Sequence, residues 1–516
     1  MLTVNGFINE QVADFTVAEN AAGMRSAIAK VRAELGREYD LVIGGKRSRT
    51  SEKIRSINPA HPNDVVGLHQ KAGQEHVEPA MQAALQAFET WKFVPASERA
   101  AWLFRVAQIL RSRKFEFDAW LVHEVGKNWA EAEADTCEAV DFCELYARLA
   151  LAMDQAEPVV QLPGERDILR YIPLGVGAVI PPWNFPLAIM CGMTVASVVA
   201  GNTVVLKPSS DSPTIAAKFF EAMEEAGLPA GVVNFCPGAG ASFGDGLVNH
   251  PKTRFIAFTG SRDVGLRINR AAAEPAPGQL WIKRTILEMG GKDGIVVSSD
   301  ADLDSAADGV VAAAFGFQGQ KCSACSRAIV DNSIYDAFLE KLLTRVSKLK
   351  IGEPTENVQM GPVINQGAME SILNYIDIGS KEGRLVAGGK RSAGDGYFIE
   401  PTVIADVPAT GRIAREEIFG PVLAVIRASD FDDALAIANN TDYGLTGAIY
   451  SRSEEHIERA KREFHVGNLY INRKCTGAMV GAHPFGGFNM SGTDSKAGGT
   501  DYLYLFTQAK SIARKV

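Results

Sequence analysis

Several features that would point to particular classes of protein are missing from this sequence. The net charge is −8 and no long basic run is present, which argues against a nucleic-acid-binding surface. The first residues, Met1–Gly6, contain neither a basic segment nor an apolar core, so we expect no secretory signal. Cysteines number seven in 516 residues, an odd count that fits a reducing compartment better than a disulfide framework. We therefore expect a cytoplasmic protein with no nucleic-acid partner.

Metal-binding patterns are also scarce. Cys322 and Cys325 form one Cys-x-x-Cys pair, but the chain has no second such pair and no His-x-x-x-His, and its eight histidines are scattered. Because a structural zinc site needs four ligands, no metal site is expected. The pair also lacks the aromatic-Cys-Gly-Pro-Cys sequence of a redox turn. Cys325 is therefore interpreted as a packing residue, with reversible oxidation as the alternative.

The longest uncharged stretch runs from Tyr171 to Leu206 and has to be weighed as a membrane span. A Pro-Pro-Trp-Asn-Phe-Pro segment ends directly before its most apolar part, Leu187–Val199, and Gly192 interrupts that part. Such breaks fit a buried strand–loop–helix–strand unit better than one continuous spanning helix. We predict no association with a membrane.

The rest of the sequence is typical of a globular α/β protein. Apolar residues make up 46% and charged residues 22%, and a chain this long is expected to form two or three lobes. Helical periodicity dominates Glu75–Arg111 and Phe115–Leu149, and strand and helix patterns alternate afterwards. This alternation predicts a parallel sheet covered by helices on both faces. The predicted strands are Gly175–Ile180, Thr203–Lys207, Val232–Phe235 and Phe255–Thr259, and the predicted helices are Leu187–Val199, Ser212–Ala226 and Val264–Ala273.

A second α/β block begins near Thr285. Its first strand is predicted at Ile295–Val297, and helix Leu303–Phe315 leads to Cys322. Further helices are predicted at Ile334–Lys348 and Met369–Gly383, and a further strand at Thr446–Tyr450.

Three segments are expected to lie outside the two α/β units. Residues 1–40 carry one amphipathic pattern, Val17–Tyr39, and are predicted to form a helical extension. Gln155–Tyr171 contains two prolines and is predicted as a hairpin that bridges the lobes, and Tyr502–Val516 alternates like a strand. A terminal strand with a free edge needs a partner, so we expect an inter-subunit sheet and at least a homodimer.

One cysteine stands apart from the others. Cys322 follows its helix in the segment Gly-Phe-Gln-Gly-Gln-Lys-Cys-Ser, which suits an exposed nucleophile better than a core position, although a small buried apolar residue is the alternative. Upstream, Glu288 stands among apolar neighbours before Gly290 and Gly291. A carboxyl group in an apolar pocket has a raised pKa, which suits a general base, whereas the alternative is a surface turn. Together the two blocks predict covalent catalysis through a thioester that Glu288 helps water to cleave.

Further polar groups follow the strands of the first unit, where ligands bind in doubly wound sheets. Asn184 offers an amide that would stabilise an oxyanion, with a turn-forming asparagine as the alternative. Lys207 suits ribose hydroxyls or phosphate, although a solvated lysine is the simpler interpretation. Ser261 precedes a helix whose N-terminus would bind an anion, or it is a plain N-cap. In the second block, Glu417 and Phe419 offer a carboxylate for a ribose diol and a ring for packing.

The blocks around Asn184, Glu288 and Cys322, in this order, resemble the aldehyde dehydrogenase superfamily over about residues 40–510. The resemblance implies a Rossmann-type cofactor domain, a second α/β catalytic domain and a small oligomerisation β-flap. It also implies that Cys322 attacks the aldehyde, that Asn184 stabilises the oxyanion and that Glu288 activates water, while hydride passes to nicotinamide. The implied domains are 41–150 with 172–284 for dinucleotide binding, 285–485 for catalysis, and 151–171 with 496–516 for oligomerisation. The implied cofactor-binding residues are Pro182, Trp183, Lys207, Ser210, Gly260, Ser261, Met289, Glu417 and Phe419.

Within the superfamily, the sequence resembles the glutamate γ-semialdehyde dehydrogenases. The segments that carry this resemblance are Gly316–Arg327, Glu463–Arg473 and Thr476–Phe488. It implies that Ser323, Gly477 and Ala478 hold the substrate carboxylate through a hydroxyl and backbone N–H groups. Phe185 and Phe485 would flank the aliphatic stem. An enzyme for another semialdehyde, such as succinic semialdehyde, is the alternative.

The cofactor preference rests on Ser210, three residues after Lys207. Many NAD-preferring members of the superfamily have a glutamate there, which would repel a 2′-phosphate, and a serine does not repel it. We therefore expect NAD to be used and NADP to be tolerated.

Other classes of protein fit the sequence less well. Acyl-transferring relatives tend to lack Glu288, a non-catalytic protein would be expected to have lost a catalytic block, and a thiol hydrolase needs a base such as histidine paired with its thiol.

Overall fold

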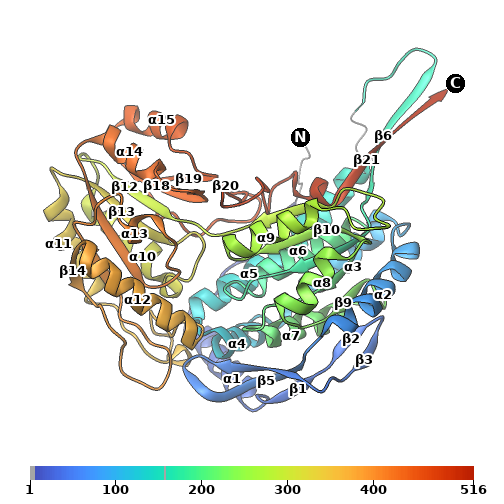
Figure 1. Cartoon of the computed structure of the whole chain (residues 1–516), viewed down its shortest axis with the longest axis horizontal. Helices are drawn as coiled ribbons and strands as arrows, with labels where there is room; N and C mark the ends of the chain where they lie inside the picture. Colours follow the sequence, from blue (N-terminus) through green and yellow to red (C-terminus); the bar gives the residue numbers. More distant parts are fainter. Residues whose placement is uncertain (1–5, 156–158) are drawn as a thin grey trace.

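The computed structural model describes residues 6–155 and 159–516, and these residues form two α/β lobes side by side (Figure 1). The first lobe is built on a seven-stranded sheet in the order β11-β10-β7-β8-β9-β2-β3. Strands from β11 to β9 are parallel, whereas β2 and β3 form an antiparallel edge. The strands are β2 (Leu41–Ile43), β3 (Lys46–Ser48), β7 (Val176–Ile180), β8 (Thr203–Leu206), β9 (Val233–Phe235), β10 (Thr253–Thr259) and β11 (Arg284–Glu288).

Helices cover both faces of this sheet, as the sequence pattern predicts (Figure 1). One face packs on α2 (Val77–Trp91), α8 (Asp245–Asn249) and α9 (Arg262–Ala273). The other face contributes to a larger core with α1 (Ala18–Arg32), α3 (Ala96–Ser112), α4 (Lys114–Val125), α5 (Trp129–Gln155), α6 (Ala188–Val199) and α7 (Pro213–Glu225). Helix α6 is buried along almost its whole length, which explains its uncharged sequence. Across residues 6–155 and 159–516, no helix combines the length and apolarity needed to cross a bilayer.

The second lobe repeats this architecture with the strand order β14-β15-β16-β13-β12-β18-β19. Only β14 runs antiparallel to its neighbour among these described strands. The strands are β12 (Asp293–Val297), β13 (Cys325–Asp331), β14 (Arg384–Ala387), β15 (Thr402–Ala405), β16 (Val422–Ala428), β18 (Thr446–Tyr450) and β19 (Asn468–Ile471). One face packs on α10 (Leu303–Phe315) and α11 (Tyr335–Val346), and the other on α12 (Gln366–Glu382), α13 (Arg412–Arg415), α14 (Phe431–Asn439) and α15 (Glu454–Glu463).

The chain crosses between the lobes directly after Glu288. Strand β11 ends at Glu288 and β12 opens the second sheet at Asp293, so the expected domain boundary at residue 285 falls inside β11. The chain returns beyond β20 (Phe488–Asn489), which pairs with β17 (Tyr443–Gly444). There Gly492 bridges to Glu288, and the Met289 N–H donates to the Ser491 carbonyl at 2.7 Å. Glu288 therefore lies where the two crossings meet.

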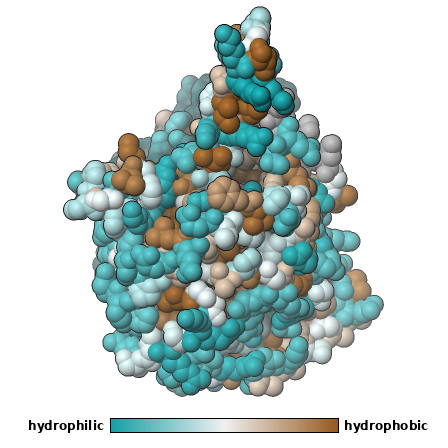
Figure 2. Space-filling view, turned by 90° about the vertical axis from the view of Figure 1, so that its right-hand side faces the viewer, coloured by the Kyte–Doolittle hydropathy of each residue, from teal (hydrophilic) through white to brown (hydrophobic). Residues whose placement is uncertain are grey.

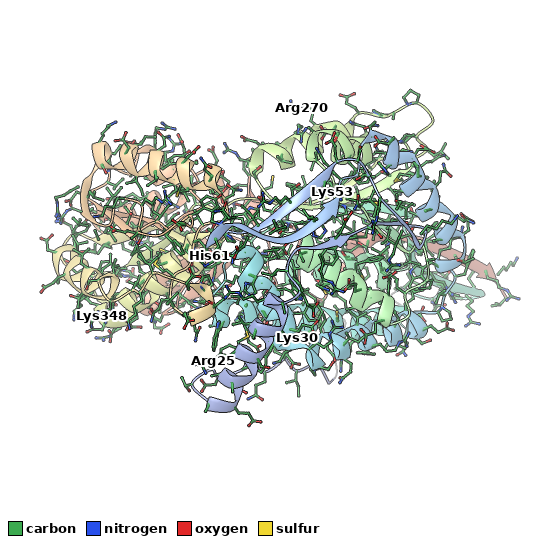
Figure 3. The ribbon with its side chains drawn as sticks, turned by 90° about the horizontal axis from the view of Figure 1, so that it is seen from below. Arg25, Lys30, Lys53, His61, Arg270 and Lys348 are labelled. Atoms are coloured by element: carbon green, nitrogen blue, oxygen red, sulfur yellow. The ribbon has the colours of Figure 1, made fainter. Side chains whose placement is uncertain are left out.

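A smaller sheet in the order β1-β5-β4 lies along the lower side of the molecule. It contains β1 (Arg37–Tyr39), β4 (Lys53–Asn58) and β5 (His61–Gln70). Seen from below, the β4–β5 ribbon reaches from the first lobe toward the second, with Lys53 and His61 near its two ends (Figure 3). His61 Nε2 lies 3.0 Å from Glu353 Oε2 of the second lobe, so this ribbon adds a contact between the lobes.

Some predicted elements differ from the structure. The amphipathic pattern Val17–Tyr39 forms helix α1 only to Arg32, and its end forms strand β1, which pairs with β5. Each of the two long helical regions contains two helices, α2 with α3 and α4 with α5. Gln155–Tyr171 is not a hairpin on itself. Residues 156–158 lie outside the described part, and β6 (Glu165–Pro173) pairs with β21 (Thr507–Lys515). The C-terminal strand therefore has a partner in its own chain, a pairing between distant segments that periodicity cannot reveal.

Candidate active site

Cys322 stands on a tight turn that follows α10. Within η3 (Gly316–Gly319), Phe317 and Gln318 have positive φ angles of 48° and 57°, so the backbone leaves the helix in a left-handed turn. Gly291 packs against this turn: a Cβ there would lie 2.2 Å from the Cys322 carbonyl oxygen, so only glycine fits. All seven cysteines lie in the described part of the chain, and Cys322 alone is not fully buried. The thiol is thus held in place and reachable.

The electrostatic surroundings keep this thiol protonated. Burial raises the pKa of the Cys322 thiol well above its usual range, and the carboxylates of Asp293, Glu417 and Glu288 raise it further. The free thiol is therefore neutral near pH 7. Nucleophilic attack needs a group that takes up its proton.

Glu288 is a buried carboxyl group at the C-terminal end of β11. Ser495 Oγ donates a hydrogen bond to Glu288 Oε1, and Oε2 has no partner among the described residues. Burial raises the pKa of Glu288 to about 8, and the Ser495 hydroxyl opposes this rise. A carboxyl group with such a pKa exchanges protons readily near neutral pH, which suits general base catalysis.

Asn184 lies in the buried loop between β7 and α6. Its Nδ2 donates to the carbonyl oxygen of Gln320 at 3.1 Å, two residues before Cys322. One of its two amide hydrogens is engaged by this bond, and the other remains for a second acceptor. The structure therefore places the amide beside the cysteine loop, as an oxyanion donor requires.

A cavity of about 350 Å³ opens at Cys322 and Glu288. It lies among α5, α6, the cysteine loop and the segment 477–480. The residues expected to bind the substrate all line it: Phe185, Ser323, Gly477, Ala478 and Phe485. The space in front of the thiol is thus lined by two aromatic rings, a hydroxyl group and a backbone turn. Gly477 in this turn has a positive φ of 79°.

The sequence interpretation missed a group of charged residues on α5. Glu131 Oε1 lies 2.6 Å from Lys321 Nζ, and Glu138 also lines the cavity with its pKa raised to about 8 by burial. Asp135 forms a buried ion pair with Lys127. The acidic residues stand at spacings of three and four, which places them on one face of the helix. That spacing in an otherwise buried helix is the signal that would have identified them.

A second group of predicted residues gathers at the carboxyl ends of the first sheet. Lys207 Nζ donates to the carbonyl oxygens of Pro208 and Gly238 at 3.1 Å each, and burial lowers its pKa to about 8. Ser261 is the N-cap of α9, and the Gly260 N–H donates to the Glu288 carbonyl at 3.0 Å. Pro182 and Met289 are buried in the loops that follow β7 and β11. Ser210 is exposed in the loop that follows β8.

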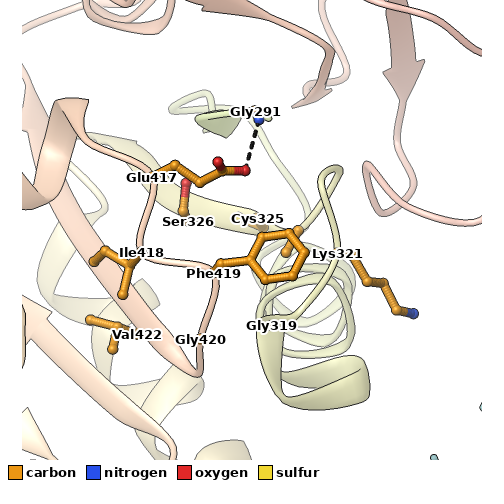
Figure 4. A pocket seen from close by; sticks show the side chains of 11 residues that line it. Gly291, Gly319, Lys321, Cys325, Ser326, Glu417, Ile418, Phe419, Gly420 and Val422 are labelled. Carbon is orange, nitrogen blue, oxygen red and sulfur yellow. Dashed lines mark hydrogen bonds between the residues drawn. The ribbon is translucent and has the colours of Figure 1, made fainter. Parts of the chain in front are cut away.

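Glu417 and Phe419 of the second lobe lie close to Gly291 and to the cysteine loop (Figure 4). Glu417 Oε1 accepts a hydrogen bond from the Gly291 N–H at 3.0 Å, and burial raises the pKa of this carboxyl to about 7. Phe419 has a positive φ of 57°, and its ring centroid lies 5.6 Å from that of Trp183, nearly at right angles. A small pocket beside Glu417 and Phe419 also borders Lys321 and Cys325 of the cysteine loop. Phe419 of the second lobe thus packs against Trp183 of the first lobe, and Lys207 lies at the carboxyl end of β8 in the first lobe.

The chain is similar to known proteins over almost its whole length. A model described as the aldehyde dehydrogenase family matches residues 46–512. The 1-pyrroline-5-carboxylate dehydrogenase of Geobacillus thermodenitrificans is 58% identical over 511 residues, which cover 99% of each chain. A structure of 1-pyrroline-5-carboxylate dehydrogenase from Thermus with bound NAD is 53% identical, covers 100% of each chain and has a TM-score of 0.98. A structure of proline utilization A from Bdellovibrio bacteriovorus is 46% identical with a TM-score of 0.97, and the match covers 99% of this chain and 53% of that one.

Proposed function

The chain belongs to the aldehyde dehydrogenase family, and we propose that it oxidises L-glutamate γ-semialdehyde to L-glutamate with NAD. The observation that carries this proposal is the cavity at Cys322, which is lined by a hydroxyl group, a backbone turn and two phenylalanine rings. A short aliphatic aldehyde with a carboxylate at its far end matches such a lining. We assign this reaction to proline breakdown as its second step, and the name of the Bdellovibrio protein, proline utilization A, supports the assignment.

Covalent catalysis starts at Cys322. Its sulfur adds to the aldehyde carbon and forms a thiohemiacetal, and the carbonyl oxygen becomes an oxyanion that Asn184 Nδ2 and the Cys322 backbone N–H stabilise. Because the pKa of the free thiol is raised, its proton has to leave as the bond forms. The cavity is open to solvent, so water can take up this proton. NAD, when bound, would supply the acceptor for the hydride that the thiohemiacetal carbon loses, and Cys322 would then carry a thioester.

Glu288 then acts on the thioester. Its carboxylate removes a proton from water, the water oxygen adds to the thioester carbon, and the Cys322 sulfur leaves as the acid is released. Ser495 holds one carboxylate oxygen while the other has no partner among the described residues and is available to water. We therefore assign Glu288 as the general base and Ser495 as a positioning residue.

The residues at the carboxyl ends of the first sheet and those around Glu417 fit a dinucleotide. Lys207 Nζ is buried, yet its partners in the described chain are two neutral carbonyl oxygens, so it can still bind ribose hydroxyl groups. Glu417 is a buried carboxylate on a glycine cradle, where a Cβ on Gly290 would lie 2.2 Å from Oε2. Such an acceptor suits a ribose diol. The proposed binding set is Pro182, Trp183, Lys207, Ser210, Gly260, Ser261, Met289, Glu417 and Phe419.

Substrate preference separates this function from its alternative. Ser323 with the backbone N–H groups of Gly477 and Ala478 would hold the carboxylate, and Phe185 and Phe485 would flank the stem. The test is the production of reduced nicotinamide with glutamate γ-semialdehyde, succinic semialdehyde and propanal. We expect the highest kcat/KM for the first. Equal values for all three would contradict the assignment of these residues as a selective carboxylate site.

The assembly is proposed to be a homo-oligomer, at least a dimer, in the cytoplasm. The ribbon of β6 and β21 projects from the body and carries apolar side chains, as Figure 2 shows. The exposed apolar residues in and beside this ribbon are Ile512 of β21, Val160 and Leu162 before β6, and Val516 after β21. Open strand edges with apolar groups favour pairing with another copy. Analytical ultracentrifugation of an Ile512→Asp variant tests this: we expect a smaller assembly than for the wild-type protein.

A further inference from the structure

The N-terminal segment Phe7–Ala13 lies against the aldehyde cavity. Glu10 and Val12 line the same cavity as Cys322, although they precede the residues that the family model matches. We call residues 7–13 the entrance segment. Its position is set by tertiary contacts, because these residues belong to no helix or strand.

Hydrogen bonds fix the entrance segment both to α5 and to residues 477–481, which we call the substrate loop. Asn9 Nδ2 donates to Asp141 Oδ2 at 2.8 Å and to the carbonyl oxygen of Val480 at 3.0 Å. The Glu10 N–H donates to Asp141 Oδ1 at 2.6 Å. One asparagine therefore connects the helix on one side of the cavity to the loop that would hold the substrate carboxylate on the other.

Further contacts hold both ends of the segment. The Ala13 N–H donates to Glu133 Oε1 at 2.9 Å, and Glu10 Oε2 pairs with Arg111 Nε at 2.8 Å. At the other end, a Cβ on Gly481 would lie 2.9 Å from the Phe7 ring, so that ring packs closely on the substrate loop. A segment with this many fixed points does not behave as a loose tail.

Exposure shows which part of the cavity the segment occupies. Val12 is 49% exposed and Met479 is 40% exposed, and both line the cavity. Glu288, which lines it as well, is only 9% exposed. The cavity therefore opens to solvent beside Val12 and Met479 and ends at the catalytic groups.

We propose that Asn9 and Val12 determine specificity: the entrance segment forms one wall of the mouth and limits the width of aldehydes that reach Cys322. Narrow, unbranched semialdehydes pass, and aromatic or branched aldehydes are excluded. The substrate side of this inference rests on the proposed function, whereas the width of the mouth does not.

Alkylation of Cys322 tests the mouth without substrate or cofactor. We compare iodoacetamide, which is narrow, with N-phenylmaleimide, which is wide, and quantify the label on the Cys322 peptide by mass spectrometry. Val12→Trp should slow the wide reagent about tenfold more than the narrow one. Val17→Trp is the matched control, since Val17 is 47% exposed and does not line the cavity. Asn9→Ala, which releases the wall, should raise the relative rate of the wide reagent.

Steady-state kinetics with benzaldehyde and glutamate γ-semialdehyde complete the test. Asn9→Ala should increase the ratio of kcat/KM for benzaldehyde to that for the semialdehyde, and Val12→Trp should decrease it. Val12→Ala provides a second widening variant if Asn9→Ala unfolds. If the alkylation ratios of the Val12 variants equal those of wild type, the proposal is overturned. If those ratios change while the semialdehyde is not oxidised by the wild-type protein, the mouth is supported and the proposed function fails.

Discussion

Lys127 Nζ lies 2.8 Å from Asp135 Oδ2, and both side chains are completely removed from solvent. Asp135 Oδ1 also accepts a hydrogen bond from the Ala188 N–H at 2.7 Å, at the start of α6. Lys127 Nζ lies 4.0 Å from the centroid of the Phe185 ring. The pair thus connects α5 to the loop that carries Asn184. A buried pair costs much desolvation free energy, so its value here lies in holding this loop in place.

Removing one partner of this pair should destabilise the protein strongly. Lys127→Met leaves the Asp135 carboxylate buried without its counter-charge, which we expect to lower the free energy of unfolding by about 3–5 kcal/mol. Chemical denaturation measures the loss. The double variant Lys127→Met/Asp135→Asn removes both charges and should recover part of it. A loss below about 1 kcal/mol in the single variant would contradict the structural role.

Replacing the nucleophile should stop dehydrogenation and leave cofactor binding intact. Cys322→Ser presents a hydroxyl group of far lower acidity, and we expect kcat to fall by about 10³-fold or more. Calorimetric titration with NAD should give an unchanged Kd. Cys325→Ser is the control, because Cys325 is buried and should retain most of the activity. Full turnover by Cys322→Ser would contradict its role.

Glu288→Gln should separate the two halves of the reaction. Without the carboxylate, the thioester forms but is not hydrolysed efficiently, so we expect a burst of about one reduced nicotinamide per site and then a rate lower by about 10²–10⁴-fold. Rapid-mixing absorbance measurements record both phases. If the variant shows full steady-state turnover, Glu288 is not the base.

The pH dependence of hydrolysis should follow the Glu288 carboxyl. Its pKa is raised to about 8 by burial, and water activation needs the ionised form, so the rate of thioester hydrolysis should rise with pH and level off above about 8. Ser495→Ala removes a hydrogen bond that favours the carboxylate and so raises the pKa of Glu288. The rising limb of the pH–rate profile should therefore move to higher pH. Ser495→Thr keeps a hydroxyl group and should restore the profile. An unchanged limb in Ser495→Ala would show that this contact does not tune the base.

Ser210 should govern the tolerance for NADP. It is exposed beyond the end of β8, three residues after Lys207. Ser210→Glu adds a negative charge, which should lower kcat/KM with NADP far more than with NAD. Ser209→Glu changes the neighbouring position and serves as a control for charge alone. Strict use of NAD by the wild-type protein would count against the expected tolerance.

Local patterns were enough for several elements of both lobes. Helix Leu303–Phe315 and strand Thr446–Tyr450 have the bounds that their patterns predict, because their apolar periodicity and capping are local properties. The pairing of β6 with β21 was not predictable in this way. It joins segments more than 300 residues apart, and neither pattern contains information about its partner.

The sequence by itself determined the reactive groups of this protein: a cysteine on a glycine-rich turn, a carboxylate among apolar residues and an asparagine after a strand. These depend on residue type and on near neighbours along the chain. Only the tertiary structure decided how each group behaves. The Ser495 contact to Glu288, the charged face of α5 and the entrance segment at the cavity mouth all depend on distant segments meeting. Burial, charge and hydrogen bonding act through space, so the pKa of a base and the width of a mouth appear only when the chain has folded.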